Sequence, residues 1–554
     1  MYSTRLHNHL PTFGSTMTQQ ADIVLRGGKI TTMALGSSAP ETVDSIALLG
    51  SEVLSVTDAE AHIGNGTHVI DLKGARVVPG LIDSHVHFIR AGRTWNDEVR
   101  FENLYSLKDG LHALAERAAS QKAGTWIRVI GGWDEHQFAE QRGPTREELD
   151  QVIPNHPVYV QMQYDYAVLN SLGLKTLGIT TETIDKTPLP EGFEKDSEGS
   201  ITGKASGMPL MTWFYRQLPA PSYDEQVEST VALSHEFARL GMTGAIDGGG
   251  VNTGPEAYAA VYEAWRQGRL KTRVRLFKHA TRAGTEQADY AGYLRFGSPR
   301  FGDDILRFSG IGEVIMYRTH DRIAAPADYG EEAMAETREV LLECARKGWT
   351  VQIHVHQREF FLKLLDLWEE IDSIHPINQL RWSFVHAEST YLEDAERLKK
   401  LGAGLLFQSL LRYNGEYAVE AWGADRVAHS PELADLWDAG VPIGLGSDAM
   451  RVASYNPFAS LEWFLTGKTV RGNKTLDEKY LLDRHRALRG YTQVGAWFTH
   501  EENVRGQLVP GQYADLAVLS EDYFTIPTDR IHTLTSDLTI VGGEIVWDSG
   551  ALHH

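Results

Sequence analysis

Short, almost entirely apolar runs alternate with helical patterns along most of the chain. Eight of these runs lie at residues 81–87, 243–249, 273–280, 306–315, 350–356, 381–388, 402–409 and 441–450. Strands that are apolar on both faces and alternate with helices are typical of a parallel sheet, and eight such units close a barrel. The pattern therefore predicts an α/β protein whose main domain, residues 81–505, is a (β/α)8 TIM barrel.

The first interval between these runs is much longer than the others, and the two chain ends differ from the middle. We expect a large insertion after the first strand, over residues 95–230, which caps the barrel mouth where active-site loops lie. Residues 21–80 and 506–549 instead show short alternating segments cut by glycine pairs, which indicate small antiparallel strands. These two ends are predicted to pair as one small β-sandwich domain.

Charge and cysteine content restrict the function and the compartment. The 554 residues include 53 Lys and Arg against 74 Asp and Glu, a formal net charge of -21. This charge opposes binding to nucleic acid, and no apolar run approaches the ~18 residues that a membrane span needs. The single cysteine, Cys344, excludes an internal disulfide and a cysteine-cluster metal site. We expect a cytoplasmic protein that acts on a small-molecule substrate, and the sequence leaves a homodimer open.

Residues that can bind a metal fall at the ends of four of the eight predicted strands. His85 and His87 alternate by two, so both imidazoles point the same way at the end of the first strand. His354, His386 and Asp448 end the fifth, sixth and eighth strands, and in a barrel these ends meet at one face. An HxH pair alone is weak evidence, but this convergence predicts a divalent metal site. Nitrogen and oxygen ligands suit Zn²⁺ and also Mn²⁺, Fe²⁺ or Co²⁺.

Several ordered motifs make the chain resemble a known family. They are VVPGLIDSHVHF at the first strand, GLGSDAM at the eighth, and ADIVLRGGKI and RGQLVPGQYADLAVL near the two ends. Together with the strand-end histidines, they are similar to motifs of the metal-dependent amidohydrolase superfamily. The resemblance is greatest to the amidohydrolase 3, or YtcJ-like, subgroup, which includes N-substituted formamide deformylases. It covers nearly all of residues 21–549 and implies the same barrel with one or two divalent metals per chain.

The resemblance also implies roles for residues of this sequence. His85 and His87 match the ligands of the more buried metal, and His354 and His386 match the ligands of a second metal where two are present. Asp448 matches the aspartate that touches metal and takes the proton of the attacking water. A divalent ion makes water nucleophilic near neutral pH. Asp448 would act as general base and then return the proton to the leaving nitrogen.

One departure from the family concerns the residue that bridges two metals. Many relatives carry a carbamylated lysine near the end of the fourth strand, whereas this chain reads SGIGEVIMY there. We expect Glu313 to be the bridging ligand, because a carboxylate can bridge two cations. The alternative is that Glu313 pairs with Arg307 or Arg318 and that the site holds a single metal. Lys278, at the end of the third run, is a weaker substitute.

Other residues near the strand ends and in the insertion are candidates for contact with the substrate. His356, two residues beyond His354, is predicted to take part in catalysis, and its alternative is a loop histidine bonded to backbone. The substrate-binding candidates are Trp133, Asp134, Tyr164, Met450 and Arg451. Two of them have a structural alternative, because Trp133 could fill the base of the insertion and Arg451 could pair with a surface acid.

The sequence thus predicts a metal-dependent hydrolase that cleaves a C–N bond, in an amide or an N-substituted formamide of a small molecule. Other metal-assisted hydrolysis, deamination and decarboxylation on the same barrel are alternatives. A non-catalytic scaffold is a further alternative, and the complete set of strand-end histidines together with Asp448 argues against it.

Overall fold

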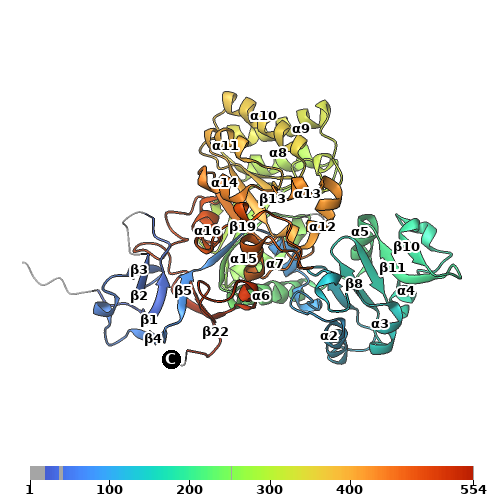
Figure 1. Cartoon of the computed structure of the whole chain (residues 1–554), viewed down its shortest axis with the longest axis horizontal. Coiled ribbons are helices and arrows are strands. Elements are labelled where there is room, and N and C mark those ends of the chain that lie inside the picture. Colours follow the sequence, from blue (N-terminus) through green and yellow to red (C-terminus); the bar gives the residue numbers. More distant parts are fainter. Residues whose placement is uncertain (1–18, 36–40, 251–252, 553–554) are drawn as a thin grey trace, which may run out of the picture.

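The computed structural model describes residues 19–35, 41–250 and 253–552, and its centre is a barrel of parallel strands (Figure 1). The barrel strands are β6 (Leu81–Val86), β12 (Met242–Asp247), β13 (Arg273–Lys278), β15 (Leu306–Ile311), β16 (Thr350–Val355), β17 (Ser383–His386), β18 (Gly404–Gln408) and β19 (Ile443–Gly446). Each pairs in parallel with the next, in chain order. Each also overlaps one of the eight predicted runs, so the prediction of a parallel eight-stranded barrel is confirmed.

The last strand returns to the first, and the barrel is nearly closed. The N–H of Asp448 donates to the carbonyl of His85 (3.0 Å), and the N–H of His87 donates to the carbonyl of Ala449 (3.0 Å). The buried carboxylate of Asp83 accepts hydrogen bonds from the backbone N–H and the hydroxyl of Ser447 (3.1 and 2.6 Å). These bonds hold the HxH end of the first strand against the loop that carries the aspartate.

Helices follow the barrel strands, as expected for repeated strand–helix units. They are α6 (Tyr223–Arg239), α7 (Ala259–Arg266), α8 (Glu286–Phe296), α9 (Glu331–Arg346), α10 (Arg358–Ile374), α11 (Ala395–Lys400), α14 (Leu433–Asp438) and α16 (Arg484–Gly490). Their apolar stripes explain the packing, since α10 buries Phe360, Leu364 and Trp368 at intervals of one helical turn. The side chains of Ser222 and Glu225 form a capping box at the start of α6.

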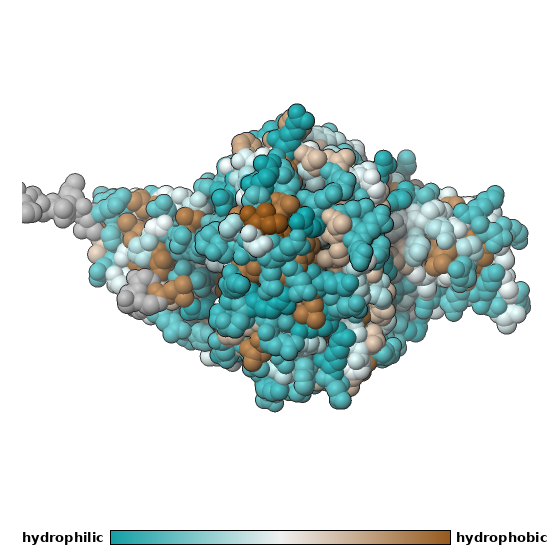
Figure 2. Space-filling model, turned by 90° about the horizontal axis from the view of Figure 1, so that it is seen from above, coloured by the Kyte–Doolittle hydropathy of each residue, from teal (hydrophilic) through white to brown (hydrophobic). Residues whose placement is uncertain are grey.

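Further elements complete the barrel domain. They are α1 (Phe88–Gly92), α12 (Leu410–Trp422), α13 (Ala424–Val427), α15 (Pro457–Thr466), α17 (Gln493–Trp497) and β14 (Phe301–Gly302). No helix in the described part of the chain combines the length and the apolar character of a membrane span. On the face shown in Figure 2, hydrophobic residues form small separate patches on a largely hydrophilic surface.

The segment between β6 and β12 forms a separate small sheet beside the barrel, at the right of Figure 1. Its strands run in the order β10 (Phe193–Lys195), β11 (Ile201–Ser206), β9 (Tyr166–Leu169), β8 (Val158–Met162) and β7 (Ile127–Ile130). Helices α2 (Leu107–Ala119), α3 (Arg146–Val152), α4 (Ser171–Leu177) and α5 (Met208–Gln217) contact it. Two apolar clusters, one around Val129 and one around Tyr159, give this segment a core of its own.

Strands from the two chain ends form one continuous sheet, at the left of Figure 1. Its order is β22 (Glu544–Asp548), β21 (Ser536–Val541), β20 (Leu516–Leu519), β5 (Arg76–Pro79), β1 (Ile23–Thr31), β2 (Thr42–Leu49) and β3 (Glu52–Ser55), with β4 (His68–Asp71) also paired to β1. The two ends pair through β20 and β5. Hydrogen bonds connect all eight strands, and one apolar cluster contains residues from both ends, among them Leu25, Ile46 and Leu516. The register of β1 is irregular between Arg26 and Ile30, and β1 pairs with β4 along its first half and with β5 further on.

Candidate metal centre

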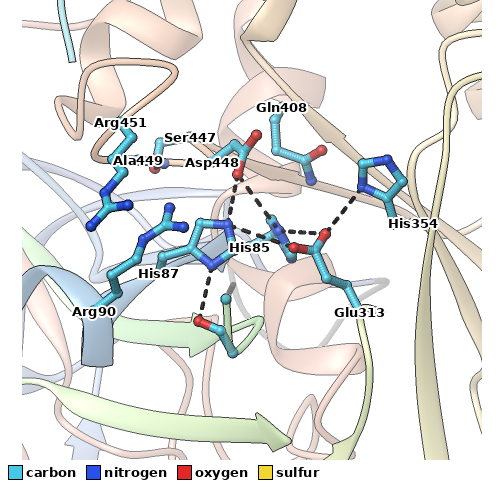
Figure 3. Close-up of polar contacts among 12 residues, drawn as sticks. His85, His87, Arg90, Glu313, His354, Gln408, Ser447, Asp448, Ala449 and Arg451 are labelled. Atoms are coloured by element: carbon cyan, nitrogen blue, oxygen red, sulfur yellow. Dashed lines mark hydrogen bonds and ion pairs between the residues drawn. The ribbon is translucent and has the colours of Figure 1, made fainter. Parts of the chain in front are cut away.

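Side chains from several barrel strands converge where the strands end (Figure 3). Nε2 of His87 lies 3.0 Å from Oδ1 of Asp448, and Nε2 of His85 lies 3.8 Å from the same oxygen. Nδ1 of His386 lies 4.0 Å from Oδ2 of Asp448. The candidate histidines of the first and sixth strands thus meet the candidate aspartate of the eighth in one buried group.

Glu313 lies within this group and faces four imidazoles. Its Oε2 is 3.5 Å from Nε2 of His85, 3.4 Å from Nδ1 of His354 and 3.5 Å from Nε2 of His386. Its Oε1 is 3.7 Å from Nε2 of His87. The carboxylate therefore lies between the histidines of the first strand and those of the fifth and sixth, where a ligand that bridges two metals would lie.

The structure shows neither arginine as a partner of Glu313 in the described part of the chain. Arg307 and Arg318 pair with other carboxylates, at 3.3 Å and 2.8 Å. Lys278 does not line the cavity described below, and its Nζ lies 4.9 Å from the ring centre of Phe308. In the part of the chain that the structure describes, only imidazoles lie within ion-pair distance of the Glu313 carboxylate.

Several polar atoms in this group are buried without a hydrogen-bond partner among the described residues. They are Nε2 of His85, Oε2 of Glu313, Nδ1 of His354 and Nδ1 of His386. A buried polar atom without a partner costs on the order of 1–3 kcal/mol, and a cation can satisfy several converging lone pairs at once. The donor set fits a divalent metal. One triad with suitable spacing is His85, His87 and Asp448, a second is His85, Glu313 and His386, and a third is His354, His356 and His386.

Hydrogen bonds from the opposite ring nitrogens orient two of the imidazoles. Nδ1 of His87 donates to the carbonyl of Gly249 (3.1 Å), and Nε2 of His354 donates to the carbonyl of Asp321 (2.9 Å). A neutral imidazole has one N–H, so each bond leaves the other nitrogen with a lone pair. The second nitrogen of His87 faces Asp448 and Glu313, and that of His354 faces Glu313 and gains its lone pair once its proton has left. Supporting hydrogen bonds give this arrangement to metal ligands.

The glycine run after β12 is explained by its closeness to the histidines. A Cβ on Gly248 would lie 2.3 Å from the ring of His85, so only glycine leaves room for that imidazole. The buried carboxylate of Asp247 accepts hydrogen bonds from the N–H groups of Gly249 (3.1 Å) and Ile89 (2.9 Å). These contacts position the loops that follow the first and second barrel strands.

Two carboxylates that the sequence analysis did not identify hold the histidines of the fifth strand. Oδ1 of Asp321 accepts from the backbone N–H of His356 (3.0 Å) and lies 3.4 Å from Nε2 of His354. Glu388 accepts from Nδ1 of His356 at 2.7 Å, which leaves Nε2 of that imidazole with a lone pair. The position of Glu388, two residues after His386, was a usable signal. Asp321 offered none, because it lies in an irregular segment after β15.

Burial and neighbouring charges determine the protonation of these groups. Burial lowers the pKa of His85, and it lowers the pKa of His87 to about 3, so both imidazoles are neutral, as metal binding requires. Burial also opposes charge on His354, but the carboxylates of Asp321 and Glu313 outweigh it and raise the pKa of His354 to about 10. A metal that binds His354 therefore has to displace a proton.

A cavity of about 780 Å³ opens over this group and extends to the inserted sheet. Asp134 and Tyr164, two of the candidate substrate residues, line this cavity together with His356. His356 also stacks on His386, with ring centres 4.6 Å apart. The cavity thus places side chains of the insertion in the same space as the strand-end histidines.

The other three substrate-binding candidates do not line this cavity. Trp133 is fully buried in the core of the insertion, where its ring stacks on Phe138, so it fills the base of the insertion and does not line the cavity. Met450 packs into the barrel core, because the insertion covers the loop that carries it. Arg451 is buried behind Tyr164 and donates to its hydroxyl (3.3 Å), so it neither lines the cavity nor pairs with a surface acid.

Comparison with known proteins agrees with this geometry. The profile of the Amidohydrolase family matches residues 68–547, which is most of the chain. The chain belongs to the Amidohydrolase family. The match includes the barrel, the insertion and part of the end sheet, and it confirms the family resemblance that the sequence motifs indicated.

Individual relatives of this amidohydrolase cover most of the chain at low identity. The protein YtcJ of Bacillus subtilis (strain 168) is 27% identical over 503 residues, 87% of this chain and 91% of YtcJ. An N-substituted formamide deformylase of Arthrobacter pascens is 23% identical over 558 residues, 96% of this chain and 99% of that protein. The solved structure of an uncharacterized metal-dependent hydrolase from Pyrococcus horikoshii has a TM-score of 0.65 and 20% identity, over 92% of this amidohydrolase and 99% of that chain. At this identity the structural match shows a shared fold.

Proposed function

We propose that the protein is a metal-dependent hydrolase that cleaves the C–N bond of an amide or an N-substituted formamide. The observation that carries the proposal is Glu313, a buried carboxylate that faces four imidazoles and whose Oε2 accepts no hydrogen bond from the described residues. Histidine and carboxylate ligands beside an open cavity are typical of a catalytic metal site. The formamide deformylase of Arthrobacter pascens, which aligns over almost its full length, supports the choice of bond.

Two divalent cations, with Zn²⁺ the first choice, would occupy the two sides of Glu313. The ligands would be His85, His87 and Asp448 on one side, and His354 and His386 with His356 nearby on the other. The absence of cysteine ligands also permits Mn²⁺, Fe²⁺ or Co²⁺. When bound, such a cation lowers the pKa of water from about 15.7 toward about 7 and polarises a carbonyl oxygen.

Asp448 is the residue that would move the proton. Burial raises the pKa of its carboxyl group, which favours a group that serves first as base and then as acid. Its backbone adopts the left-handed region (φ 60°), which costs a non-glycine residue about 1–3 kcal/mol, and its N–H bond to the His85 carbonyl holds it there. Asp448 would accept the proton of the attacking water and then donate it to the leaving nitrogen.

The size of the cavity supports a small-molecule substrate. A volume of about 780 Å³ falls in the range of about 300–1,000 Å³ that is usual for small-molecule sites. Carboxylates and histidines at the strand ends supply the polar groups, and the inserted sheet supplies the opposite wall through Asp134 and Tyr164. The insertion would therefore select the substrate, and the barrel would carry out the reaction.

Metal removal and one substitution test this function. Dialysis against a chelator should abolish release of formate from N-substituted formamides, and Zn²⁺ or Mn²⁺ should restore it. Asp448→Asn should lower kcat by about 10²- to 10⁴-fold, the range for loss of a general acid–base group, while the protein still binds metal. Glu416→Gln, which alters an acid at the cavity wall outside the candidate ligand set, is the matched control and should keep kcat within a few-fold.

Either of two results would contradict the proposal. Normal turnover by Asp448→Asn would show that another group moves the proton. Undiminished activity after the metal content has been reduced to zero, measured by elemental analysis, would exclude a metal-dependent reaction.

A further inference from the structure

Two arginines lie buried beside the metal centre without a carboxylate partner. Arg90, on α1, and Arg451, after the last barrel strand, are 9% and 6% exposed. Within the described ranges, the only hydrogen bonds of the two guanidinium groups go to the hydroxyl of Tyr164, at 3.2 and 3.3 Å. Figure 3 shows the two guanidinium groups next to each other and close to His87. Buried arginines usually form an ion pair with an acid, so the positive charge of these two arginines is not neutralised by a neighbouring carboxylate.

The acids around the two arginines are already engaged. Asp448 faces the histidines, and Glu98, which lines a small hollow behind the arginines, pairs with Arg100 at 2.6 Å. Arg451 is held by an aromatic ring instead, since its guanidinium carbon lies 4.0 Å from the ring centre of Tyr215. The residues that the structure describes therefore supply no counter-charge within ion-pair distance of these two guanidinium groups, although the net charge of the chain is -21.

Arg90 and Tyr164 have donor groups left for a ligand. A guanidinium carries five N–H donors, and in the described structure only Nη1 of Arg90 forms a hydrogen bond. Both residues line the cavity. The Tyr164 oxygen accepts from two cations, and its own O–H has no acceptor among the described residues, so it can donate into the cavity.

We propose that Arg90 and Tyr164, with Arg451 behind them, form a subsite that binds a carboxylate group of the substrate. One guanidinium and one hydroxyl on the cavity wall match the single charge and two oxygens of a carboxylate. The subsite rests on the proposed hydrolytic function and narrows it. The substrate would be an N-formyl or N-acyl compound that carries a carboxylate, such as an N-acylated amino acid.

The subsite also gives the insertion a specific role. Arg90 and Arg451 follow the first and last barrel strands, whereas Tyr164 comes from the turn between β8 and β9 of the inserted sheet. The backbone N–H of Gly132, at the end of β7, donates to the carbonyl of Arg451 (2.9 Å), which fixes the insertion against the arginine. The reaction centre and the carboxylate subsite would thus lie in one cavity. The insertion would complete the carboxylate subsite by supplying Tyr164.

Two compounds that differ in charge test this subsite. N-formyl-L-phenylalanine and its C-terminal amide would be compared as substrates of the zinc-loaded protein, and as ligands of zinc-loaded Asp448→Asn by isothermal titration calorimetry. We expect a preference of about 10- to 100-fold for the carboxylate compound, the range for a hydrogen bond to a charged group. Arg90→Met should reduce the preference to about unity through KM, and Tyr164→Phe should reduce it in part. Arg471→Met, which alters an exposed arginine of the same cavity, should retain it.

The outcomes separate the subsite from the proposed function. Equal use of the two compounds by the unaltered protein would overturn the subsite, as would a preference that survives both Arg90→Met and Tyr164→Phe, because the metals would then be binding the carboxylate. Preferential binding of the carboxylate compound without any turnover would count against the hydrolytic function alone. If Arg90→Met fails to fold, as judged by circular dichroism, Tyr164→Phe and Arg90→Lys decide the question.

Discussion

Two buried glutamates at opposite ends of strand β15 have opposite surroundings. Glu501 lies near the start of the strand and accepts hydrogen bonds from Arg275 (2.8 and 2.9 Å), Arg505 (2.7 Å) and Thr499 (2.7 Å). Glu313 lies just beyond the end of the strand, and it faces imidazoles at 3.4 to 3.7 Å. Its Oε2 accepts no hydrogen bond in the described structure.

The difference lies in the partners of the two carboxylates. Burial opposes ionisation of both, yet Arg505 lowers the pKa of Glu501, and the group of histidines that faces Glu313 lowers the pKa of that carboxyl. Permanent cations satisfy Glu501, whereas the partners of Glu313 are imidazoles whose lone pairs can bind a metal. In barrels of this kind the strand starts serve stability and the strand ends serve catalysis. Buried acceptors without a hydrogen-bond partner, and not buried charge as such, therefore mark the functional end of the barrel strands.

Glu501→Gln should have the largest effect, and it should be an effect on stability. The substitution leaves Arg275 and Arg505 buried without their counter-charge, so we expect the free energy of unfolding to fall by about 3–5 kcal/mol. Urea denaturation of the metal-free protein measures this change. The activity of the folded fraction should remain unchanged.

The neighbouring acid provides the control for this comparison. Glu502 pairs with Arg381 at 2.6 Å and is partly exposed, so Glu502→Gln should cost less than Glu501→Gln. If Glu501→Gln left stability intact but removed activity, the assignment of the strand-start cluster to stability would be wrong.

Glu313→Gln, unlike Glu501→Gln, should act on metal binding and activity. The amide keeps the shape of the side chain but removes the charge shared by the two cations, so metal content should fall from two toward one per chain. We expect kcat/KM to fall by about 10²- to 10³-fold, as for loss of one electrostatic group in an active site. Elemental analysis and steady-state kinetics measure the two effects. A variant with full metal content and full activity would contradict the bridging role.

The pH dependence of metal binding is the smallest expected effect. The carboxylates of Asp321 and Glu313, against the effect of burial, raise the pKa of metal-free His354 to about 10. Its protonation therefore stabilises the metal-free fold fully below about pH 6.5, and this contribution is lost as pH rises through about 10. Metal affinity should rise by about tenfold per pH unit, because one proton leaves His354 on binding. Calorimetry in two buffers of different ionisation enthalpy counts that proton, and its absence near pH 7.5 would contradict this assignment.

The barrel and its candidate ligands could be predicted because both repeat a simple pattern. Each strand is a short apolar run, and side chains at the ends of parallel strands must meet at one face of a barrel. His85, His354 and His386 needed only this rule to be placed together. Glu313 was harder to place, since it lies in the loop after β15, and only the absence of the family's lysine pointed to it.

Residues that were missed or misplaced depend on packing between distant segments. Asp321 acts through hydrogen bonds to the fifth strand from an irregular segment that no spacing in the sequence marks, whereas Glu388, two residues after His386, was missed although its position was a signal. Trp133 was predicted to contact substrate, but the core of the insertion buries it. At the chain ends, the irregular register of β1 lets this strand pair with both β4 and β5, a detail that the residue pattern does not specify.

Anomalous scattering from a zinc-loaded crystal tests the central claim most directly. We predict two zinc peaks, one on each side of Glu313, with His85, His87 and Asp448 around one peak and His354 and His386 around the other. Zinc bound elsewhere, or a Glu313 carboxylate that contacts no metal while the histidines remain empty, would contradict the account.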